Sequence, residues 1–197
     1  KFGGETVVIS VGDDSNKEIM RKALAMGIDS GMLLKSDGAL DSDGVATLLA
    51  NEIKDGGYDI VFMGKQSVDF DTSMVGQLTA SKAGINCITV CVSLTIDNNS
   101  VTAEREIEGG REVVNSSLPI VITAQKGLND PRYPNLKGIM DAKRKKLEEK
   151  AVTAPSPLVE VLEMSLPAPK APGRILGTDS SAVPELVRLL REEAKVI

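Results

Sequence analysis

Short apolar runs alternate with helix-length segments over the first half of the chain. The strand-like runs are Glu5–Gly12, Gly31–Leu34, Asp59–Gly64 and Cys87–Thr95, of which the first is rich in β-branched residues and ends in glycine. Between them, apolar residues recur at helical spacing in Asn16–Gly27, Asp43–Lys54 and Asp71–Ala83. Strands separated by single helices favour a parallel sheet with right-handed crossovers. The pattern therefore predicts an α/β fold with a mostly parallel sheet flanked by helices.

The pattern then changes to the alternation of an antiparallel hairpin. Ser100–Glu106 and Glu112–Ser117 alternate in polarity around a Gly109-Gly110 turn, which predicts a hairpin at the edge of the sheet. Pro119–Ala124 follows as one more apolar strand. In residues 129–135 two prolines stiffen the chain, and after Gly138 the residues are typical of a basic helix that includes Lys143–Lys146.

The last quarter of the chain has a different composition. Residues 152–178 carry five prolines, which predicts an extended arm with little regular structure. Val183–Ala194 then predicts an amphipathic terminal helix with Pro184 near its first turn. We expect residues 1–150 to form the α/β domain and residues 151–197 to form an arm and helix. The residues alone leave open whether this part packs on a partner or folds back.

Composition excludes several kinds of chemistry. The chain has no histidine, so it offers neither an imidazole base nor a histidine metal ligand, and we predict no catalytic residues and no metal site. Cys87 and Cys91 lie in an apolar run and are expected to be buried thiols. The net charge of −5 argues against nucleic-acid binding, although Lys143–Lys146 form a basic island suited to an acidic partner surface.

The chain shows no targeting or membrane-spanning pattern. No apolar run approaches the about 18 residues that a membrane helix needs, and no signal peptide is expected. The sequence begins at Lys1 rather than Met and runs directly into a strand, so we expect the opening of the natural chain to be missing.

The turn after Asp59–Gly64 is the best candidate for a ligand site. Ligands of open parallel sheets bind beyond the carboxyl ends of strands, and Gly64 allows close approach to the backbone. We expect Asp71, Thr72 and Ser73 to begin the next helix, where free N–H groups suit a phosphate. Ordinary helix capping by these residues is the alternative. A P-loop NTPase or a Rossmann dehydrogenase is disfavoured, because neither glycine fingerprint is present.

Three stretches resemble the electron transfer flavoprotein β-subunit family: residues 129–146, Gly64–Asp71 and Glu104–Gly110. The resemblance implies a Rossmann-like, adenine-nucleotide-binding fold that holds a structural AMP. It also implies a heterodimer with an α subunit, which would carry most of the FAD site. The β subunit would be an electron carrier rather than an enzyme, and its arm and terminal helix would pack on the α subunit.

The resemblance also implies the site residues. Those for the cofactor are Val11, Gly64, Lys65, Gln66, Ser67, Val68, Asp69, Phe70, Asp71, Thr72, Ser73, Met74 and Val75. Those for docking a dehydrogenase are Arg132, Leu136, Ile139, Met140, Lys143, Arg144 and Lys145. Leu136 is the expected anchor, Lys143–Lys146 would steer the encounter, and Arg132 is expected to brace the loop from inside.

The family resemblance leaves two rivals open. The threonine at position 72 resembles the electron-bifurcating branch of the family, whose β subunit holds a second FAD in place of AMP. The glutamine at position 77 instead resembles the AMP-binding branch. An ATP-using α/β enzyme is the rival from another class. In the main reading, electrons pass from flavin dehydrogenases of the acyl-CoA type to a quinone oxidoreductase. The implied location is the cytoplasm, or the mitochondrial matrix in a eukaryote.

Overall fold

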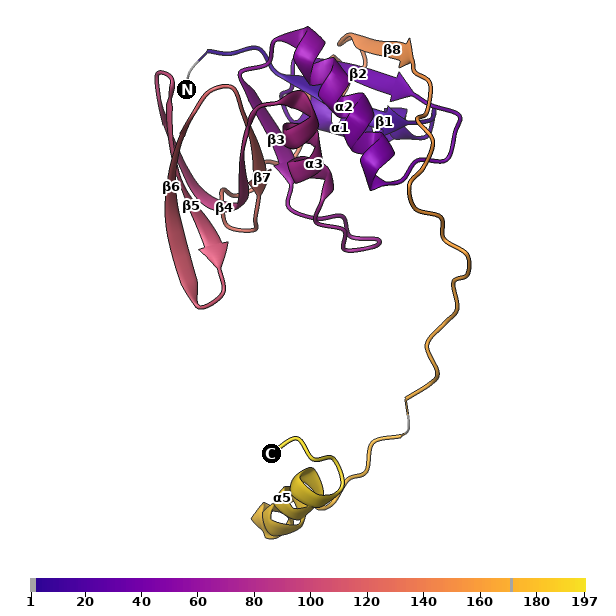
Figure 1. Cartoon of the computed structure of the whole chain (residues 1–197), viewed down its shortest axis with the longest axis vertical. Helices are drawn as coiled ribbons and strands as arrows, with labels where there is room; N and C mark the ends of the chain where they lie inside the picture. Colours follow the sequence, from indigo (N-terminus) through magenta and orange to yellow (C-terminus); the bar gives the residue numbers. More distant parts are fainter. Residues whose placement is uncertain (1–2, 171) are drawn as a thin grey trace. The chain divides into compact units, whose positions relative to one another are not determined.

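Two sheets form the first part of the chain in a computed structural model that describes residues 3–170 and 172–197. The smaller sheet is parallel and has the order β1-β2-β8 (Figure 1), from β1 (Val7–Gly12), β2 (Ser30–Lys35) and β8 (Leu147–Ala151). The larger sheet has the order β3-β7-β4-β5-β6. Its strands are β3 (Ile60–Gly64), β7 (Ile120–Ala124), β4 (Asn86–Asp97), β5 (Ser100–Ile107) and β6 (Gly110–Ser117).

The ladders confirm the predicted fold class. β3, β7 and β4 pair in parallel, whereas β4, β5 and β6 pair antiparallel and place the predicted hairpin at the sheet edge. The helix Asn16–Ala25 separates β1 from β2 in sequence and the helix Val75–Ala83 separates β3 from β4, as an α/β fold requires, whereas β5 and β6 stand between β4 and β7. The prediction of one sheet is incomplete, since no ladder among the described residues joins β1 to β3.

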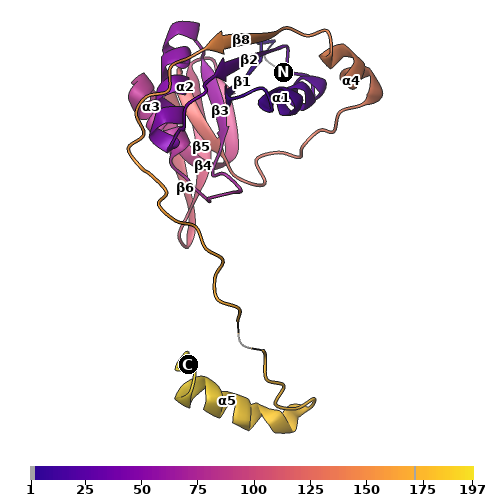
Figure 2. The ribbon, with the colours of Figure 1, turned by 90° about the vertical axis from the view of Figure 1, so that its right-hand side faces the viewer.

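The helices cover the sheets and connect them. They are α1 (Asn16–Ala25), α2 (Ser42–Gly56), α3 (Val75–Ala83), α4 (Leu136–Ala142) and α5 (Val183–Glu192), with a 3₁₀ turn at Ser180–Ala182 before α5. Helix α2 packs on both α3 and β1, so it links the two sheets. Asp41 caps its first turn, and Gly57 ends it in the left-handed conformation. Figure 2 shows α4 beside α1, with which it is in contact.

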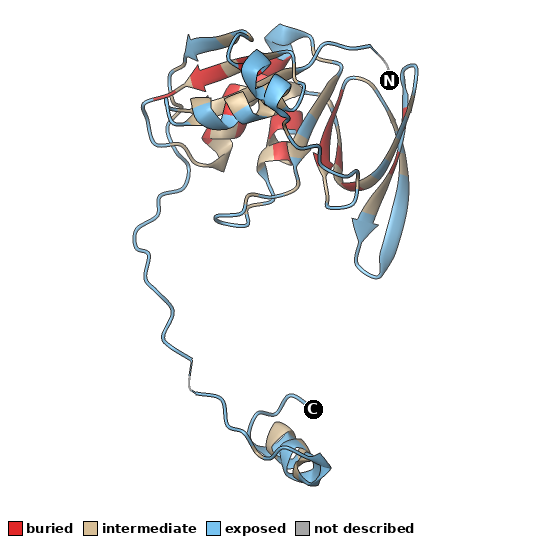
Figure 3. Cartoon of the chain, turned by 180° about the vertical axis from the view of Figure 1, so that it is seen from behind, coloured by how far each residue is buried: buried red, intermediate tan, exposed pale blue. Residues whose placement is uncertain are grey.

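The main core lies in the larger sheet around β7. Four of the five residues of β7 are fully buried, because a strand in the interior of a covered sheet is apolar on both faces. Figure 3 shows the buried residues gathered in the sheets and in the helices that cover them. The buried residues that pack together in the main core are Ile88, Cys91, Val101, Ala103, Ile120 and Ile122.

Two predicted helices are wrong in part. Helix α3 begins at Val75 rather than at Asp71, so residues 71–74 belong to the loop before it. The basic run is not helical either: α4 ends at Ala142, the chain turns as the N–H groups of Arg144 and Lys145 donate to the Asp141 carbonyl, and β8 follows. β8 was missed because its residues are mostly charged, as is common in an exposed edge strand.

The chain after β8 is an extended segment followed by α5. Residues 152–179 contain no helix or strand where they are described, which agrees with the predicted arm, and Ala171 of that arm lies outside the described residues, as do Lys1 and Phe2. Residues up to Glu160 belong to the first structural unit, and residues 161–197 form the second. The predicted boundary at residue 150 stays a prediction. No helix in the described chain is long and apolar enough to span a bilayer.

Candidate functional site

The 64–75 loop connects the carboxyl end of β3 to the first residue of α3. Its start continues the sheet, because the Lys65 N–H donates to the Ala124 carbonyl at the end of β7, with 3.1 Å between the two atoms. The carboxyl ends of β3 and β7 therefore lie side by side beneath the loop. This is the edge at which open parallel sheets bind ligands.

Hydrogen bonds between its two halves close the 64–75 loop. The Ser67 N–H donates to the Thr72 carbonyl at 3.3 Å, and the hydroxyl oxygens of Ser67 and Thr72 lie 3.1 Å apart. The Ser73 hydroxyl donates to the Lys65 carbonyl at 3.0 Å, and the Gln66 amide donates to an Asp71 carboxylate oxygen at 3.0 Å. Because the polar groups bind one another, the loop has a defined shape.

The acidic residues of the loop accept hydrogen bonds from other loop residues and do not cap the helix that follows. Asp69 accepts the Phe70 N–H at 2.7 Å, and the Ser67 hydroxyl and then this N–H lower the pKa of Asp69 below its usual value. Asp71 has a positive φ of 52°, a conformation that non-glycine residues seldom adopt. The expectation that Asp71, Thr72 and Ser73 begin the helix is therefore wrong, since all three precede it.

The first turn of α3 has no side-chain cap. Its N-cap residue is Met74, which has no acceptor oxygen on its side chain, and no side chain of the described residues caps this end. The Gln77 amide nitrogen turns back to the Ser73 carbonyl at 2.8 Å, and its buried Oε1 has no partner among the described residues. The helix thus keeps free N–H groups and its positive dipole end beside the loop, and Gln77 adds an acceptor.

The tip of the loop exposes large apolar side chains. Val68 is 99% exposed and Phe70 is 65% exposed, and Met74 is also exposed. Apolar groups this exposed in an ordered loop can offer a flat surface to an aromatic ring.

Val11 lies in the other sheet, near the end of β1. It is half-buried, and its carbonyl accepts the Asn16 side-chain amide at 3.4 Å. No hydrogen bond among the described residues joins Val11 to the 64–75 loop. The described chain therefore brings residues 64–75 together but does not bond Val11 to them.

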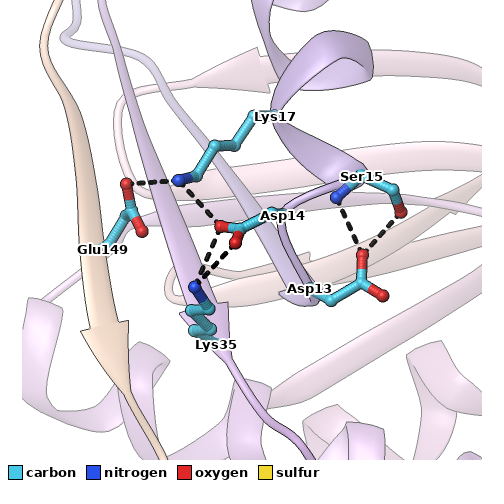
Figure 4. A network of polar contacts seen from close by, with 6 residues as sticks. All are labelled: Asp13, Asp14, Ser15, Lys17, Lys35 and Glu149. Atoms are coloured by element: carbon cyan, nitrogen blue, oxygen red, sulfur yellow. Dashed lines mark hydrogen bonds and ion pairs between the residues drawn. The ribbon is translucent and has the colours of Figure 1, made fainter.

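A charged network closes the carboxyl end of the smaller sheet (Figure 4). Asp14 accepts the ammonium of Lys17 at 2.8 Å and that of Lys35 at 2.9 Å, and these two cations lower the pKa of Asp14. Lys17 also pairs with Glu149 of β8 at 2.7 Å. The network fixes the turn between β1 and α1 to the end of β2 and to the middle of β8, and sequence periodicity gave no sign of it.

The 129–146 segment presents an apolar face on a short helix. Asn135 caps α4 by accepting the Gly138 N–H at 2.7 Å. Leu136 is 84% exposed and Met140 is 60% exposed, and Ile139 and the preceding Tyr133 are also exposed. Positions 136, 139 and 140 follow the spacing of one helical face, so the exposed apolar groups are contiguous.

The cations near α4 divide into two kinds. Lys143 and Arg144 are exposed, but the Lys145 ammonium donates to the carbonyls of Leu24 and Ile28, at 3.0 Å and 2.6 Å. Arg132 was expected to brace the loop from inside. It is exposed instead, and its side chain makes no hydrogen bond within residues 3–170 and 172–197.

The two cysteines offer no reactive thiol. Cys91 is buried and Cys87 is half-buried, and burial raises the pKa of both. No group of three or more potential metal ligands occurs in the part of the chain that the structure describes.

Comparison with known proteins places these features in one family. The family model for the electron transfer flavoprotein domain matches residues 1–155. The electron transfer flavoprotein subunit beta of Bacillus subtilis is 36% identical over 208 residues, which covers all of this chain and 81% of that protein. The mitochondrial β subunit of Arabidopsis thaliana is 33% identical and covers all of this chain and 79% of its own length. The mouse β subunit is 40% identical over 75% of this chain and 60% of its own length.

Proposed function

The chain belongs to the electron transfer flavoprotein family as a β subunit, and we propose that it binds AMP at the 64–75 loop. In this proposal it pairs with an α subunit and forms one side of the FAD pocket held mainly by that subunit. It also docks flavin dehydrogenases through the 129–146 segment.

The uncapped first turn of α3 carries the nucleotide proposal. A phosphate placed there would receive backbone N–H groups that no described side chain occupies, and it would meet the positive end of the helix dipole. The closed loop needs little further ordering before it binds, because Ser67 and Thr72 already join its two halves. Asp69 accepts the Phe70 N–H and Asp71 accepts the Gln66 amide, so both carboxylates are engaged within the loop and do not cap the first turn of α3.

The exposed face of α4 supports the docking proposal. Leu136 and Met140 offer an apolar anchor, and Lys143 and Arg144 supply positive charge beside it. An anchor that enters an apolar pocket supplies binding energy, whereas the charges raise the rate of encounter with an acidic surface.

The second structural unit supports pairing with an α subunit. Helix α5 has apolar residues on one face and no buried residue, so within the described chain that face has no core to join. An apolar helix face on an extended arm suits a groove on another chain. The arm and α5 therefore assemble the heterodimer in this proposal.

The chain supplies binding and geometry rather than a reactive group. FAD, when bound in the α subunit, would supply the capacity to accept and release electrons. We place the donor among acyl-CoA dehydrogenases of fatty acid oxidation and the acceptor in a quinone oxidoreductase. The proposed location is the cytoplasm, or the mitochondrial matrix in a eukaryote.

A second FAD in place of AMP is the competing cofactor. The exposed Val68, Phe70 and Met74 favour it, because FAD adds an isoalloxazine ring to the adenine that both ligands share and so covers more apolar surface than AMP. Mass spectrometry of the nucleotide released from the denatured heterodimer separates the two. One AMP and one FAD per heterodimer supports the proposal, two FAD supports bifurcation, and no AMP with ATP hydrolysis would overturn both.

A further inference from the structure

Helix α4 is fastened to α1 by a reciprocal pair of long cations, one from each segment. Arg21 of α1 donates from Nη1 to the carbonyls of Ala142 and Lys145, at 2.6 Å and 2.7 Å. Lys145 donates from Nζ to the carbonyls of Leu24 and Ile28, at the carboxyl end of α1. Each cation thus binds the backbone of the other segment, across more than one hundred residues of sequence.

Two of the four carbonyls, those of Leu24 and Ala142, belong to the last turns of α1 and α4, and the other two, those of Ile28 and Lys145, lie in the turns just beyond these helices. A lysine or arginine near a helix carboxyl end adds donors to such carbonyls and complements the negative end of the helix dipole. Lys145 reaches back because the Asp141 carbonyl accepts the N–H groups of Arg144 and Lys145 in a tight turn. The turn separates the half-buried Lys145 from its exposed neighbours Lys143 and Arg144.

Close backbone contact completes the fastening. A Cβ at Gly138 would lie 2.4 Å from the Ala25 carbonyl oxygen, so only glycine allows α4 to approach α1 this closely. Ala142 is 3% exposed at the other end of α4. Helix α4 is therefore held at both ends, although its outer face is exposed.

We propose that Arg21 and Lys145 are positioning residues for docking: they form a clasp that fixes the exposed face of α4 before a dehydrogenase arrives. A helix of seven residues is not stable alone, so without the clasp Leu136 and Met140 would be presented by a fraying segment. Ordering that segment on binding would lower the affinity for the dehydrogenase. This inference rests on the docking role of α4 proposed above. It assigns Lys145 a task different from electrostatic steering.

The test uses the complete heterodimer with its bound FAD. Lys145→Met keeps most of the side-chain length and removes both hydrogen bonds, and Lys145→Arg keeps the charge and the donors. Lys143→Met is the matched control, because it loses the same charge from an exposed position two residues away. Arg21→Met removes the opposite half of the clasp and serves if the Lys145→Met protein is poorly folded.

Hydrogen exchange of the α4 amides, including that of Ile139, measures the clasp without reference to docking. Lys145→Met and Arg21→Met should each raise exchange in residues 139–142 by roughly tenfold or more, because the bonds that hold the segment are lost. Lys145→Arg should restore slow exchange, and Lys143→Met should leave it unchanged. Unchanged exchange in both methionine variants would overturn the clasp.

Flavin reduction by an acyl-CoA dehydrogenase with its acyl-CoA substrate then measures docking. At limiting dehydrogenase in about 0.5 M salt, where charge steering is screened, Lys145→Met should stay slow and Lys143→Met should approach the wild-type rate. FAD content should not change. Fast exchange together with wild-type reduction would leave the clasp standing and overturn the docking role of α4.

Discussion

Gly76 of α3 and Thr123 of β7 lie so close together that no residue larger than glycine fits at position 76. A Cβ built on Gly76 would lie 2.4 Å from the Thr123 Cγ2. The Thr123 hydroxyl meanwhile accepts the Val90 N–H at 3.0 Å, where β4 is irregular. The contact sets the distance of the α3 first turn, and so of the candidate phosphate site, from the sheet.

Gly76→Ala should destabilise the fold by about 1–3 kcal/mol, because the added methyl group forces α3 away from β7. Adding Thr123→Ser should recover most of that loss, since serine lacks the clashing methyl but keeps the hydroxyl that binds Val90. Thermal unfolding of the heterodimer with and without AMP measures both effects. Gly110→Ala is the matched control, because nothing lies within 4 Å of its Cβ position. A Gly76→Ala protein as stable as wild type would contradict the tight contact.

Thr72→Val should lower the amount of nucleotide that remains bound after purification. Valine keeps the shape but removes the hydroxyl that lies 3.1 Å from the Ser67 hydroxyl, so the two halves of the loop lose a link. A missing hydrogen bond of this kind costs about 1–3 kcal/mol, or roughly a 5- to 150-fold loss of affinity. Titration of stripped heterodimer with AMP measures the change. Thr102→Val, which removes a hydroxyl bound to Asn115 in the hairpin, is the control. Equal affinity in the Thr72 and Thr102 variants would show that closure of the loop does not matter.

Sequence patterns predicted the elements that bury a continuous apolar run or one apolar face. The apolar strands such as β7 and the amphipathic helix α2 were predicted because burial on a defined face dictates their residue pattern. The edge strand β8 was not predicted, because its charged residues are as compatible with a helix as with an exposed sheet edge. The start of α3 was placed four residues early, because Asp71, Thr72 and Ser73 are good capping residues that here close the loop.

The clasp of Arg21 and Lys145 could not be read from the sequence. Lys145 stands in a run of four cations that all look alike in composition, and only the turn at Asp141 distinguishes it. Its partners are the backbone carbonyls of Leu24 and Ile28, and because every residue has such a carbonyl, the residue type does not reveal the contact. Gly76 did carry a signal, since a glycine inside a helix calls for a packing reason.

The attachment of the arm should weaken in acid through Asp41. One carboxylate oxygen accepts the Gly44 N–H at 2.8 Å and the other accepts those of Leu158 and Val159, and these bonds lower the pKa of Asp41. Because the pKa is lowered in the folded state, the attachment is complete above the ordinary aspartate value of about 3.9 and is lost as the pH falls through the lowered value.

Amide chemical shifts of Leu158 and Val159 between neutral pH and about pH 2.5 would follow this loss. We expect a midpoint below about 3.9 in the wild type and no such transition in Asp41→Asn. A midpoint above the ordinary value would contradict the lowered pKa, and an unchanged transition in Asp41→Asn would assign it to another group.

A chain that ends at Glu160 should fold but pair weakly with the α subunit. The truncation keeps the first structural unit, including the bonds from Leu158 and Val159 to Asp41, and removes the rest of the arm and α5. Co-purification with a tagged α subunit measures pairing, and thermal unfolding checks the fold. Leu186→Glu in the full chain is the companion variant, because it places a charge on the apolar face of α5 without shortening the arm. If both variants pair as the wild type does, the arm and α5 have no role in assembly.

Leu136→Ala should slow electron delivery from a dehydrogenase without disturbing the β subunit itself. Leu136 is 84% exposed, so its truncation leaves no cavity and should not change the melting temperature or FAD content. The clasp holds the side chain in place, and an anchor side chain of this kind contributes about 2 kcal/mol or more to binding, which corresponds to roughly a 30-fold loss of affinity. Stopped-flow reduction at limiting acyl-CoA dehydrogenase should therefore be slow, and saturating dehydrogenase should restore much of the rate. Ile107→Ala, which truncates an exposed apolar residue in the β5–β6 hairpin, is the control. Wild-type reduction by Leu136→Ala at limiting partner would remove Leu136 from the interface, and a parallel loss of FAD would mean that the segment acts on the cofactor pocket.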